Sequence, residues 1–415
     1  MKVCLLNLGC KVNQYEIDAI LNSLSKKYET TTELEYADIY VVNTCAVTSE
    51  AEKKSRQYMS KIKAVNSDAK IIVCGCASQN NAEQFLEKEN VVLVLGTARK
   101  GEIVDLIEKE AGNLVCDIPL TYEDNMFSTN VRTRAYLKIQ DGCNNFCSYC
   151  LIPYVRGRSR SRDLKSIVKE AEELSKTANE IVITGINISD YKIDGKLALN
   201  EVMKALSTIK SRIRIGSLEV NVITDELLKT LSEMKNFCPQ FHLSLQSGSN
   251  AVLKKMNRHY SRDEYLEKVE LIRKYFENPA ITTDIIVGFP TETEDDFNDT
   301  IDLIKKAKFS QVHYFAYSSR SGTVASRFPQ INGKVIKERE AKLKEVCAAV
   351  RDEYLNLFIN KTLPVLIEEK IENGLYTGFS DNYLRCYVKA ENIVVGEIID
   401  LKVDSVFKDG YLCKL

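Results

Sequence analysis

Short apolar runs alternate with amphipathic stretches along most of the chain. In its first part the strands are expected at residues 2–8, 38–43, 70–74 and 91–95. Helices are expected between them at 13–27, where Ile17, Ile20 and Leu24 share one face, and at 99–110. Such alternation is typical of βα units on a parallel sheet, so it predicts an α/β domain over 1–125 that ends in a polar linker at 121–130.

A second series of βα units begins near Arg134. Its strands are expected at 135–140, 180–184, 212–218, 241–245, 282–287 and 311–315. About six repeats predict a partial (β/α)6 barrel rather than a complete barrel of eight units. The core is expected to cover 129–357 and to close with a long helix at 334–358. A barrel of this kind gathers its chemistry at the C-terminal ends of its strands.

The last part of the chain, 358–415, changes to β-rich alternation with turns at 372–374, 380–382 and 408–410. This pattern predicts a small antiparallel β-barrel, a form that often binds nucleic acid. The segment carries seven basic and nine acidic residues, so RNA binding there would need a local basic patch.

Thirteen cysteines are spread over the whole chain, and their odd number argues against a simple disulfide framework. No apolar run approaches the ~18 to 20 residues that span a bilayer, and the N-terminus lacks the pattern of a signal peptide. We therefore expect no membrane association and a cytoplasmic location. Thiols stay reduced there, and clustered cysteines more often hold metal than form disulfides.

The sharpest motif is a CxxxCxxC run at Cys143, Cys147 and Cys150, directly after the first strand of the second series. Three soft thiolates on so short a loop suit an iron–sulfur cluster. Structural zinc is the main alternative, but it requires four ligands and no fourth Cys or His follows nearby. Neighbouring thiols without any metal are the second alternative.

A second group of three cysteines is identified because each one follows a predicted strand, not because of their spacing in the sequence. Cys10 follows the first predicted strand, Cys45 the second and Cys76 the third. Because the ends of parallel strands lie side by side, these three thiols are expected to converge at one sheet edge. Buried cysteines are also common as small hydrophobic residues, and that explanation would suffice for any one of the three. Cys74 is interpreted as part of its strand.

The CxxxCxxC motif with Tyr149 before its last cysteine, on a βα series of this length, resembles the radical S-adenosylmethionine superfamily. This resemblance implies that three cysteines hold a [4Fe–4S] cluster whose open iron binds S-adenosylmethionine. Reductive cleavage then gives a 5′-deoxyadenosyl radical that abstracts hydrogen from an unactivated C–H bond.

Two three-cysteine sites, the first on a flavodoxin-like domain, resemble the methylthiotransferase family. Further matching segments are HLSLQSGS at 242–249, LKKMNRHYS at 253–261, TDIIVGFPTETEDDF at 283–297 and YSSRSGTVA at 317–325. The C-terminal barrel is similar to the RNA-binding TRAM domain. The opening LGCKVNQYE at 8–16 resembles the subgroup that acts on N6-threonylcarbamoyladenosine in tRNA. Relatives specific for isopentenyladenosine or for a ribosomal-protein aspartate are the alternatives within the family.

This resemblance implies two [4Fe–4S] clusters, S-adenosylmethionine as methyl donor and radical source, and the anticodon stem-loop of tRNA as substrate. An electron donor such as flavodoxin or ferredoxin and a sulfur source are expected as partners, and the chain is expected to be a monomer. Both thiol triplets would then face one cavity. A non-catalytic iron–sulfur protein that binds RNA is the alternative from another class.

Basic residues are concentrated between 129 and 165, with eight Lys and Arg against two Asp. The RGRSRSR stretch follows the cysteine loop, so Arg156, Arg158 and Arg160 are predicted to bind tRNA phosphates. A solvated charged loop is the alternative.

Contacts to S-adenosylmethionine are predicted for Tyr149, Gly185, Glu219 and Gln246, although each could equally be a turn or packing residue. Relatives often have Glu-Pro where this chain has Glu219-Val220, which puts the role of Glu219 in doubt. His242 and His313 lie in strand-like segments and are interpreted as structural.

Overall fold

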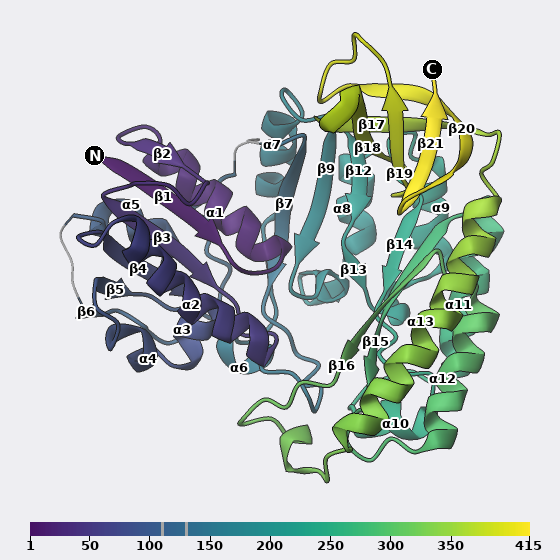
Figure 1. Ribbon diagram of the computed structural model, residues 1–415, viewed down its shortest axis with the longest axis horizontal. Coiled ribbons are helices and arrows are strands. Elements are labelled where there is room, and N and C mark those ends of the chain that lie inside the picture. Colours follow the sequence, from purple (N-terminus) through teal and green to yellow (C-terminus); the bar gives the residue numbers. More distant parts are fainter. Residues whose placement is uncertain (109–111, 129–131) are drawn as a thin grey trace.

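The computed structural model describes residues 1–108, 112–128 and 132–415. Three units follow one another along the chain: an N-terminal α/β unit, a curled sheet covered by helices, and a small C-terminal β-barrel (Figure 1). The last residues of the predicted linker and of the helix predicted at 99–110 lie outside the described residues. Within the described residues, no helix combines the length and apolar character needed to cross a bilayer.

The N-terminal unit contains one parallel sheet with the strand order β2-β1-β3-β4-β5-β6. Its strands are β1 (Lys2–Asn7), β2 (Glu29–Thr31), β3 (Ile39–Thr44), β4 (Lys70–Gly75), β5 (Val91–Val94) and β6 (Gly112–Asn113). The flavodoxin-like prediction is confirmed, because this order places the topological switch between β1 and β3. The short strands β2 and β6 had not been predicted.

Helices cover both faces of this sheet. They are α1 (Lys11–Leu24), α2 (Ser49–Val65), α3 (Cys76–Asn80), α4 (Glu83–Leu86), η1 (Lys100–Glu102) and α5 (Ile103–Leu106). Alternate strand side chains point to opposite faces. Val3 and Leu5 therefore pack with Ile17 of α1, whereas Leu6 packs with Met59 of α2 in a separate core.

The second unit is a curled, mostly parallel sheet. Its strands are β7 (Arg134–Asp141), β8 (Arg160–Ser161), β9 (Glu180–Gly185), β12 (Arg212–Ile215), β13 (Ser217–Leu218), β14 (Gln240–Leu243), β15 (Ala280–Val287) and β16 (Gln311–Ala316). They form the sheets β12-β9-β7-β8 and β13-β14-β15-β16, and only Gly216 separates β12 from β13. The six predicted strands and the partial barrel are confirmed.

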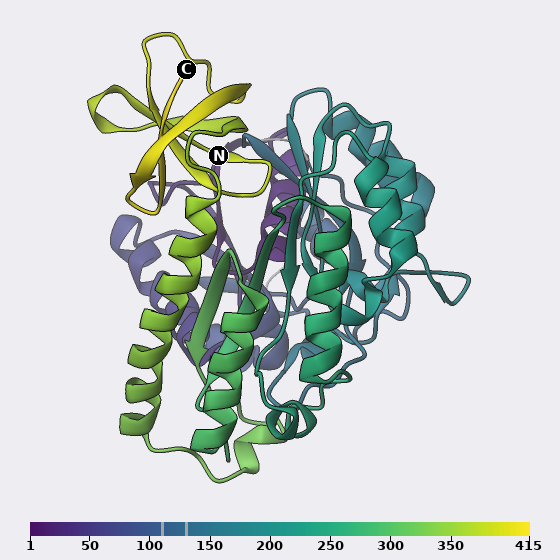
Figure 2. The ribbon, with the colours of Figure 1, turned by 90° about the vertical axis from the view of Figure 1, so that its right-hand side faces the viewer.

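The main helices of this unit pack against the outside of the curled sheet (Figure 2). They are α7 (Leu164–Leu174), α8 (Leu199–Leu206), α9 (Asp225–Glu233), α11 (Arg262–Tyr275), α12 (Glu294–Ala307) and α13 (Gly333–Asn356). The connections also contain the short helices α6 (Ile152–Val155), η2 (Ile188–Asp190), η3 (Val220–Val222), α10 (Asn250–Lys255) and η4 (Ala325–Arg327) and the hairpin β10 (Lys192–Ile193) and β11 (Lys196–Leu197).

The C-terminal unit is a closed barrel with the order β17-β18-β19-β21-β20. Its elements are β17 (Thr362–Lys370), η5 (Glu372–Gly374), β18 (Leu375–Ser380), β19 (Arg385–Lys389), β20 (Ile398–Phe407) and β21 (Gly410–Lys414). The predicted small β-barrel is confirmed, and its strand pairs are antiparallel except for β19 and β21, which run parallel. A closed ring with an odd number of strands cannot alternate direction throughout.

Candidate functional site

Three cysteines meet at the carboxyl edge of the N-terminal sheet, and we call them the N-terminal triplet. Cys10 caps α1 just after β1, Cys45 follows β3, and Cys76 opens α3 directly after β4. Because these three strands are adjacent and parallel, their ends bring the thiols together. Burial raises the pKa of Cys45 to about 11, with smaller contributions from the nearby thiols of Cys76 and Cys10.

Gly75 fixes the place of Cys76. Its φ is +110°, and a Cβ there would lie 2.5 Å from the backbone oxygen of Thr44. Only glycine fits so tight a turn at the end of β4. Cys74 lies inside the strand and is buried.

The other three cysteines lie on the loop after β7, and we call them the barrel triplet. The turn begins at Gly142, with a φ of +74°, and the Cys143 amide donates to the Gly157 carbonyl at 3.0 Å. Burial raises the pKa of Cys150 to about 12, with smaller contributions from the thiols of Cys147 and Cys143.

Several N–H groups point at the sulfurs of the barrel triplet. The amides of Asn145 and Ile152 donate to Cys143 and Cys150 at 3.5 and 3.4 Å. The Arg258 guanidinium donates to Cys147 Sγ at 3.4 Å. Such donors stabilise thiolate ligands of a cluster. Sequence reasoning had not selected Arg258, although it lies in the matching segment LKKMNRHYS.

Within the described residues, no three His, Cys, Asp or Glu side chains are arranged around a single metal-ion position. Each cysteine of a [4Fe–4S] cluster binds a different iron, so the sulfurs stay apart around the cluster. All six thiols are free, and each triplet is grouped at one strand edge or on one loop. The donor set therefore fits iron–sulfur clusters better than a single ion.

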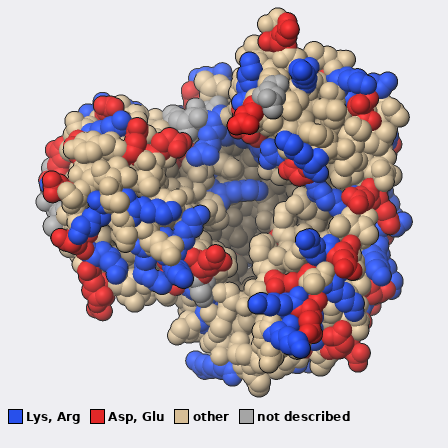
Figure 3. Space-filling view, viewed as in Figure 1, with Lys and Arg blue, Asp and Glu red and all other residues tan. Residues whose placement is uncertain are grey.

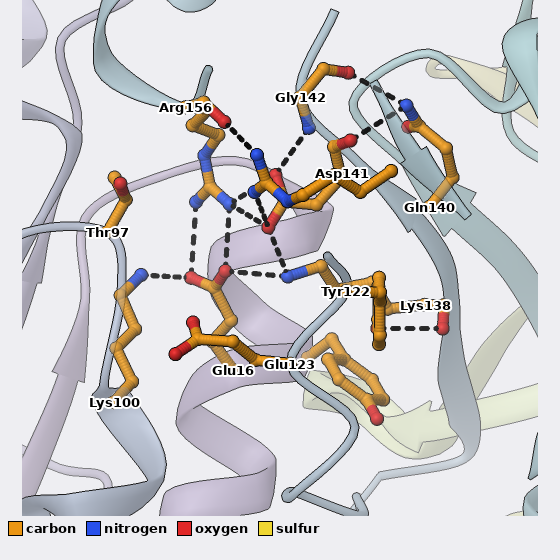
Figure 4. Close-up of polar contacts among 12 residues, drawn as sticks. Glu16, Thr97, Lys100, Tyr122, Glu123, Lys138, Gln140, Asp141, Gly142 and Arg156 are labelled. Atoms are coloured by element: carbon orange, nitrogen blue, oxygen red, sulfur yellow. Dashed lines mark hydrogen bonds and ion pairs between the residues drawn. The ribbon is translucent and has the colours of Figure 1, made fainter. Parts of the chain in front are cut away.

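A buried ionic network joins the two units (Figure 4). Glu16 of α1 accepts hydrogen bonds from Lys100, from Lys138 of β7 at 3.1 Å and from Arg156 at 2.8 Å. Asp141, at the end of β7, also binds Arg156 and Lys138, at 3.2 and 2.6 Å. Burial opposes ionisation of Glu16, but its three cationic partners outweigh burial and hold its pKa well below the ordinary value.

Arg156 connects the network to the N-terminal triplet. Its Nε donates to Cys76 Sγ at 3.2 Å, and its Nη2 donates to the Asn13 side chain at 3.0 Å. Arg156 follows α6, which lies only two residues beyond Cys150 and packs through Val155 into the core that contains Cys76. The two triplets thus lie on facing elements of one interface.

The buried position of Arg156 corrects its predicted role. Its exposure is 0%, so its guanidinium cannot reach a tRNA phosphate in this conformation. Arg160 is also buried, and it donates to the carbonyls of Arg156 and Arg158 at 2.8 and 3.0 Å. Arg158 is exposed and lies over the Phe146 ring at 4.5 Å, so phosphate binding stays a prediction for this residue.

Much of the positive charge predicted between 129 and 165 is neutralised by acidic residues elsewhere in the chain. Arg134 pairs with Glu368, Lys138 and Arg156 pair with Glu16, and Arg162 pairs with Glu170. Glu170 lies only eight residues after Arg162, but the partners of Arg134, Lys138 and Arg156 are more than 100 residues away in sequence, so local sequence could not show their pairing.

Of the four residues predicted to contact S-adenosylmethionine, Tyr149 and Glu219 have contacts on or beside the cysteine loop. Tyr149, on the loop itself, packs against Val252 and Phe289. Glu219, after β13, accepts from Asn145 at 3.2 Å and pairs with Arg258. Gly185 ends β9, where a Cβ would lie 2.9 Å from the Gln140 carbonyl oxygen, so packing alone explains this glycine.

Gln246 follows β14 with a φ of +70°, and its backbone pairs with β15 through Asp284 and Ile286. His242 is held by Thr282 at 2.9 Å and by Asp284 at 3.2 Å. The structural interpretation of His242 agrees with these contacts.

Comparisons with known proteins agree with this architecture. A model described as the Radical SAM superfamily matches residues 137–304, and one described as Uncharacterized protein family UPF0004 matches residues 2–96. Among solved structures, the radical S-adenosylmethionine methyltransferase TsrM from Kitasatospora setae has a TM-score of 0.59 and 14% identity, and the match covers 78% of this chain and 77% of TsrM. That likeness concerns the fold alone.

Curated relatives extend along nearly the whole chain. "Threonylcarbamoyladenosine tRNA methylthiotransferase MtaB" of Bacillus subtilis (strain 168) is 37% identical, over 97% of this chain and 93% of the relative. The protein of the same name from Thermotoga maritima is 39% identical, over 97% and 94%. A "tRNA-2-methylthio-N(6)-dimethylallyladenosine synthase" of Thermoanaerobacter sp. (strain X514) is 34% identical, over 95% and 88%.

The curled barrel with its cysteine loop defines a radical S-adenosylmethionine enzyme. With the UPF0004 match at its N-terminal unit and these full-length relatives, the chain belongs to the MtaB-like methylthiotransferase family.

Proposed function

We propose that this protein is a tRNA methylthiotransferase that converts N6-threonylcarbamoyladenosine beside the anticodon into its 2-methylthio derivative. One observation carries the proposal: two thiol triplets lie on facing elements of one interface, where Arg156, six residues after Cys150, donates to Cys76. Relatives named for this activity are 36–39% identical along nearly the whole chain, which supports the same substrate.

Carbon 2 of adenine has no acidic proton and no leaving group, so side-chain acid–base catalysis offers little there. The barrel triplet would hold the [4Fe–4S] cluster that binds S-adenosylmethionine, and the N-terminal triplet would hold a second cluster. When bound, these groups supply the radical, the methyl group and the sulfur. The chain itself orients the two sites: Arg258 hydrogen-bonds to Cys147, and Arg156 holds Cys76 against the barrel.

Tyr149, Gly185, Glu219 and Gln246 stay our candidates for contacts to S-adenosylmethionine. Glu219 has the strongest support, because its carboxylate already bonds to Asn145 of the cysteine loop and to Arg258. Arg158 is the candidate for a phosphate of the tRNA, since it is exposed beside that loop.

We propose domain boundaries at 1–125, 129–357 and 358–415, consistent with the breaks between the sheets. We also propose a cytoplasmic monomer that draws electrons from a flavodoxin or ferredoxin and sulfur from a separate donor.

The activity is tested with anaerobically reconstituted protein, S-adenosylmethionine and a reductant. Separate reactions contain tRNA with threonylcarbamoyladenosine and tRNA with dimethylallyladenosine, and the nucleosides are analysed by mass spectrometry. We expect the methylthio product only from the first tRNA, together with 5′-deoxyadenosine. Product only from the second tRNA would assign the activity of the dimethylallyladenosine relatives. A cluster spectrum without 5′-deoxyadenosine would indicate a non-catalytic iron–sulfur protein.

The metal ligands are tested by replacing one triplet at a time with alanine. Electron paramagnetic resonance of the Cys143, Cys147 and Cys150 triple variant should still show one cluster, and so should the Cys10, Cys45 and Cys76 triple variant. Loss of both clusters in either variant would contradict two independent sites.

A further inference from the structure

A cavity of about 480 Å³ lies between the inner face of the curled sheet, the C-terminal barrel and the start of α1. We call it the lumen cavity. Figure 3 shows a deep hollow at the centre of this face, with Lys and Arg side chains on its wall. Five lining residues are Lys or Arg and only one is acidic, Asp409; the cations are Lys11, Arg134, Arg214, Arg351 and Arg385.

Most of these cations already have carboxylate partners. Arg214 pairs with Glu180 at 2.9 Å, Arg134 pairs with Glu368, and Arg385 pairs with Asp409 at 3.1 Å. Arg351 donates instead to the Gln311 side chain at 3.0 Å and to a backbone carbonyl. Their charges are therefore largely engaged in holding the wall together.

Lys11 is different. Within the part of the chain that the structure describes, its ammonium makes no hydrogen bond or ion pair with another side chain. Its side chain is exposed and lines the lumen cavity.

Arg134 and Arg214 line the same cavity and repel the Lys11 ammonium, because they carry the same charge. An anionic group that enters the lumen cavity would offset this repulsion and form an ion pair with Lys11. The cavity wall near Lys11 is held in place by hydrogen bonds within the protein. Arg214 donates to Glu180 and to the backbone carbonyls of Asp381 and Ser380.

We propose that Lys11 binds the carboxylate of the substrate's threonylcarbamoyl group and thereby selects a carboxylated adenosine. This inference rests on the proposed function. Lys11 directly follows Cys10 of the N-terminal triplet. A carboxylate bound at Lys11 would therefore bring the attached adenine beside the predicted source of sulfur.

A tRNA phosphate is the other anion that could bind Lys11, and the experiment separates the two. Three anticodon stem-loops are compared by fluorescence anisotropy with the anaerobic, cluster-loaded protein. They carry threonylcarbamoyladenosine, its carboxylate methyl ester, or plain adenosine. The wild type should bind the first stem-loop roughly 10- to 100-fold more tightly than the ester.

Lys11→Met should bind all three stem-loops with similar affinity, and Lys11→Arg should retain most of the preference. Lys26→Met is the matched control, because Lys26 is exposed just beyond the other end of α1. It should behave as the wild type. Iron and sulfide content must match the wild type in each variant, since Lys11 adjoins Cys10.

Three results would overturn the inference. First, equal affinity of the wild type for the threonylcarbamoyladenosine stem-loop and for its methyl ester would show that the carboxylate makes no contact. This measurement needs no variant protein. Lys11→Met that still prefers the acid assigns the contact to another residue. An equal loss for all three stem-loops would indicate a phosphate contact. Failure of the wild type to methylthiolate threonylcarbamoyladenosine would instead contradict the proposed function.

Discussion

Arg156 illustrates how one residue can serve the interface rather than the substrate. Its five N–H donors form a rigid fork, and the surrounding oxygens of Glu16, Asp141 and Asn13 match that fork. Two residues along the chain, Arg158 faces solvent. The sequence RGR does not distinguish these fates, because the acidic partners come from α1 and β7.

Replacement of Arg156 by glutamine should destabilise the interface strongly. Glu16 and Asp141 would keep their buried charges but lose a shared partner, which costs about 3–5 kcal/mol. Hydrogen–deuterium exchange of amides in α1 and α6 should show a local opening free energy lower by that amount. Arg158→Gln is the matched control, and its effect should stay within about 0.5 kcal/mol. Equal exchange in the two variants would contradict this role of Arg156.

The position of the cysteine loop depends on the tight turn that follows strand β7. Gly142 has a φ of +74°, and a Cβ there would lie 2.0 Å from the Arg158 carbonyl oxygen. Gly195 has a similar φ of +78° but open space around it. Substitution at either glycine carries the free-energy cost of a left-handed backbone, but only substitution at Gly142 adds a steric clash. Comparison of the two variants therefore isolates the effect of the clash.

Gly142→Ala should displace the cysteine loop and lower the iron and sulfide bound after anaerobic reconstitution by about one cluster per chain. Gly195→Ala has the same left-handed backbone penalty, about 1 kcal/mol, and should retain full iron content. Full iron content in Gly142→Ala would show that the loop tolerates the clash.

Glu180, the first residue of β9, links the curled sheet to the C-terminal barrel. Its carboxylate pairs with Arg212 at 2.5 Å and Arg214 at 2.9 Å, and Arg214 also donates to the Ser380 carbonyl. Burial opposes ionisation of Glu180, but the guanidinium groups of Arg214 and Arg212 outweigh it and lower the pKa to about 2.

Because the folded-state pKa of Glu180 is below its ordinary value, its contribution to stability is present above about pH 4.5 and is lost as the pH falls towards 2. The contribution is on the order of 3 kcal/mol. Urea denaturation at a series of pH values should show this loss in the wild type. Glu180→Gln should be less stable at neutral pH and should lack that part of the acid slope. An unchanged slope would assign the acid sensitivity to other carboxylates.

Over the whole molecule, tRNA binding must rely on local positive charge, because the formal net charge is only −1. Most arginines of the basic segment are engaged in internal ion pairs. Arg158 remains exposed beside the cysteine loop, over the ring of Phe146.

The dependence of tRNA affinity on salt should therefore change in only one of two neighbouring variants. Arg158→Gln should reduce the slope of log affinity against log salt by about 0.7 to 0.9, the value for one phosphate contact. Arg160→Gln should leave the slope nearly unchanged, because its guanidinium is bonded to two carbonyls inside the protein. The reverse order would show that Arg160 leaves its buried position on binding.

Much of the architecture follows from local sequence patterns. The strands at 39–44 and 180–185 contain the uninterrupted apolar runs IYVV and IVI, a pattern typical of buried parallel strands. The strands β2 and β6 were missed because they have three and two residues and too little pattern to detect. The direction of β21 was missed because it depends on closure of the barrel, which no single segment encodes.

The sequence by itself determined the order of the three units, the strand ends that bear the N-terminal triplet, and the cysteine loop after β7. These features depend on hydrophobic period and on neighbours close in sequence. Only the tertiary structure decided which charges are buried and which are free. Glu16, Arg156 and Asp141 meet across an interface of two units, while Lys11 enters a cavity lined by all three. Electrostatic environment depends on distance in space, and residues far apart in the chain set it.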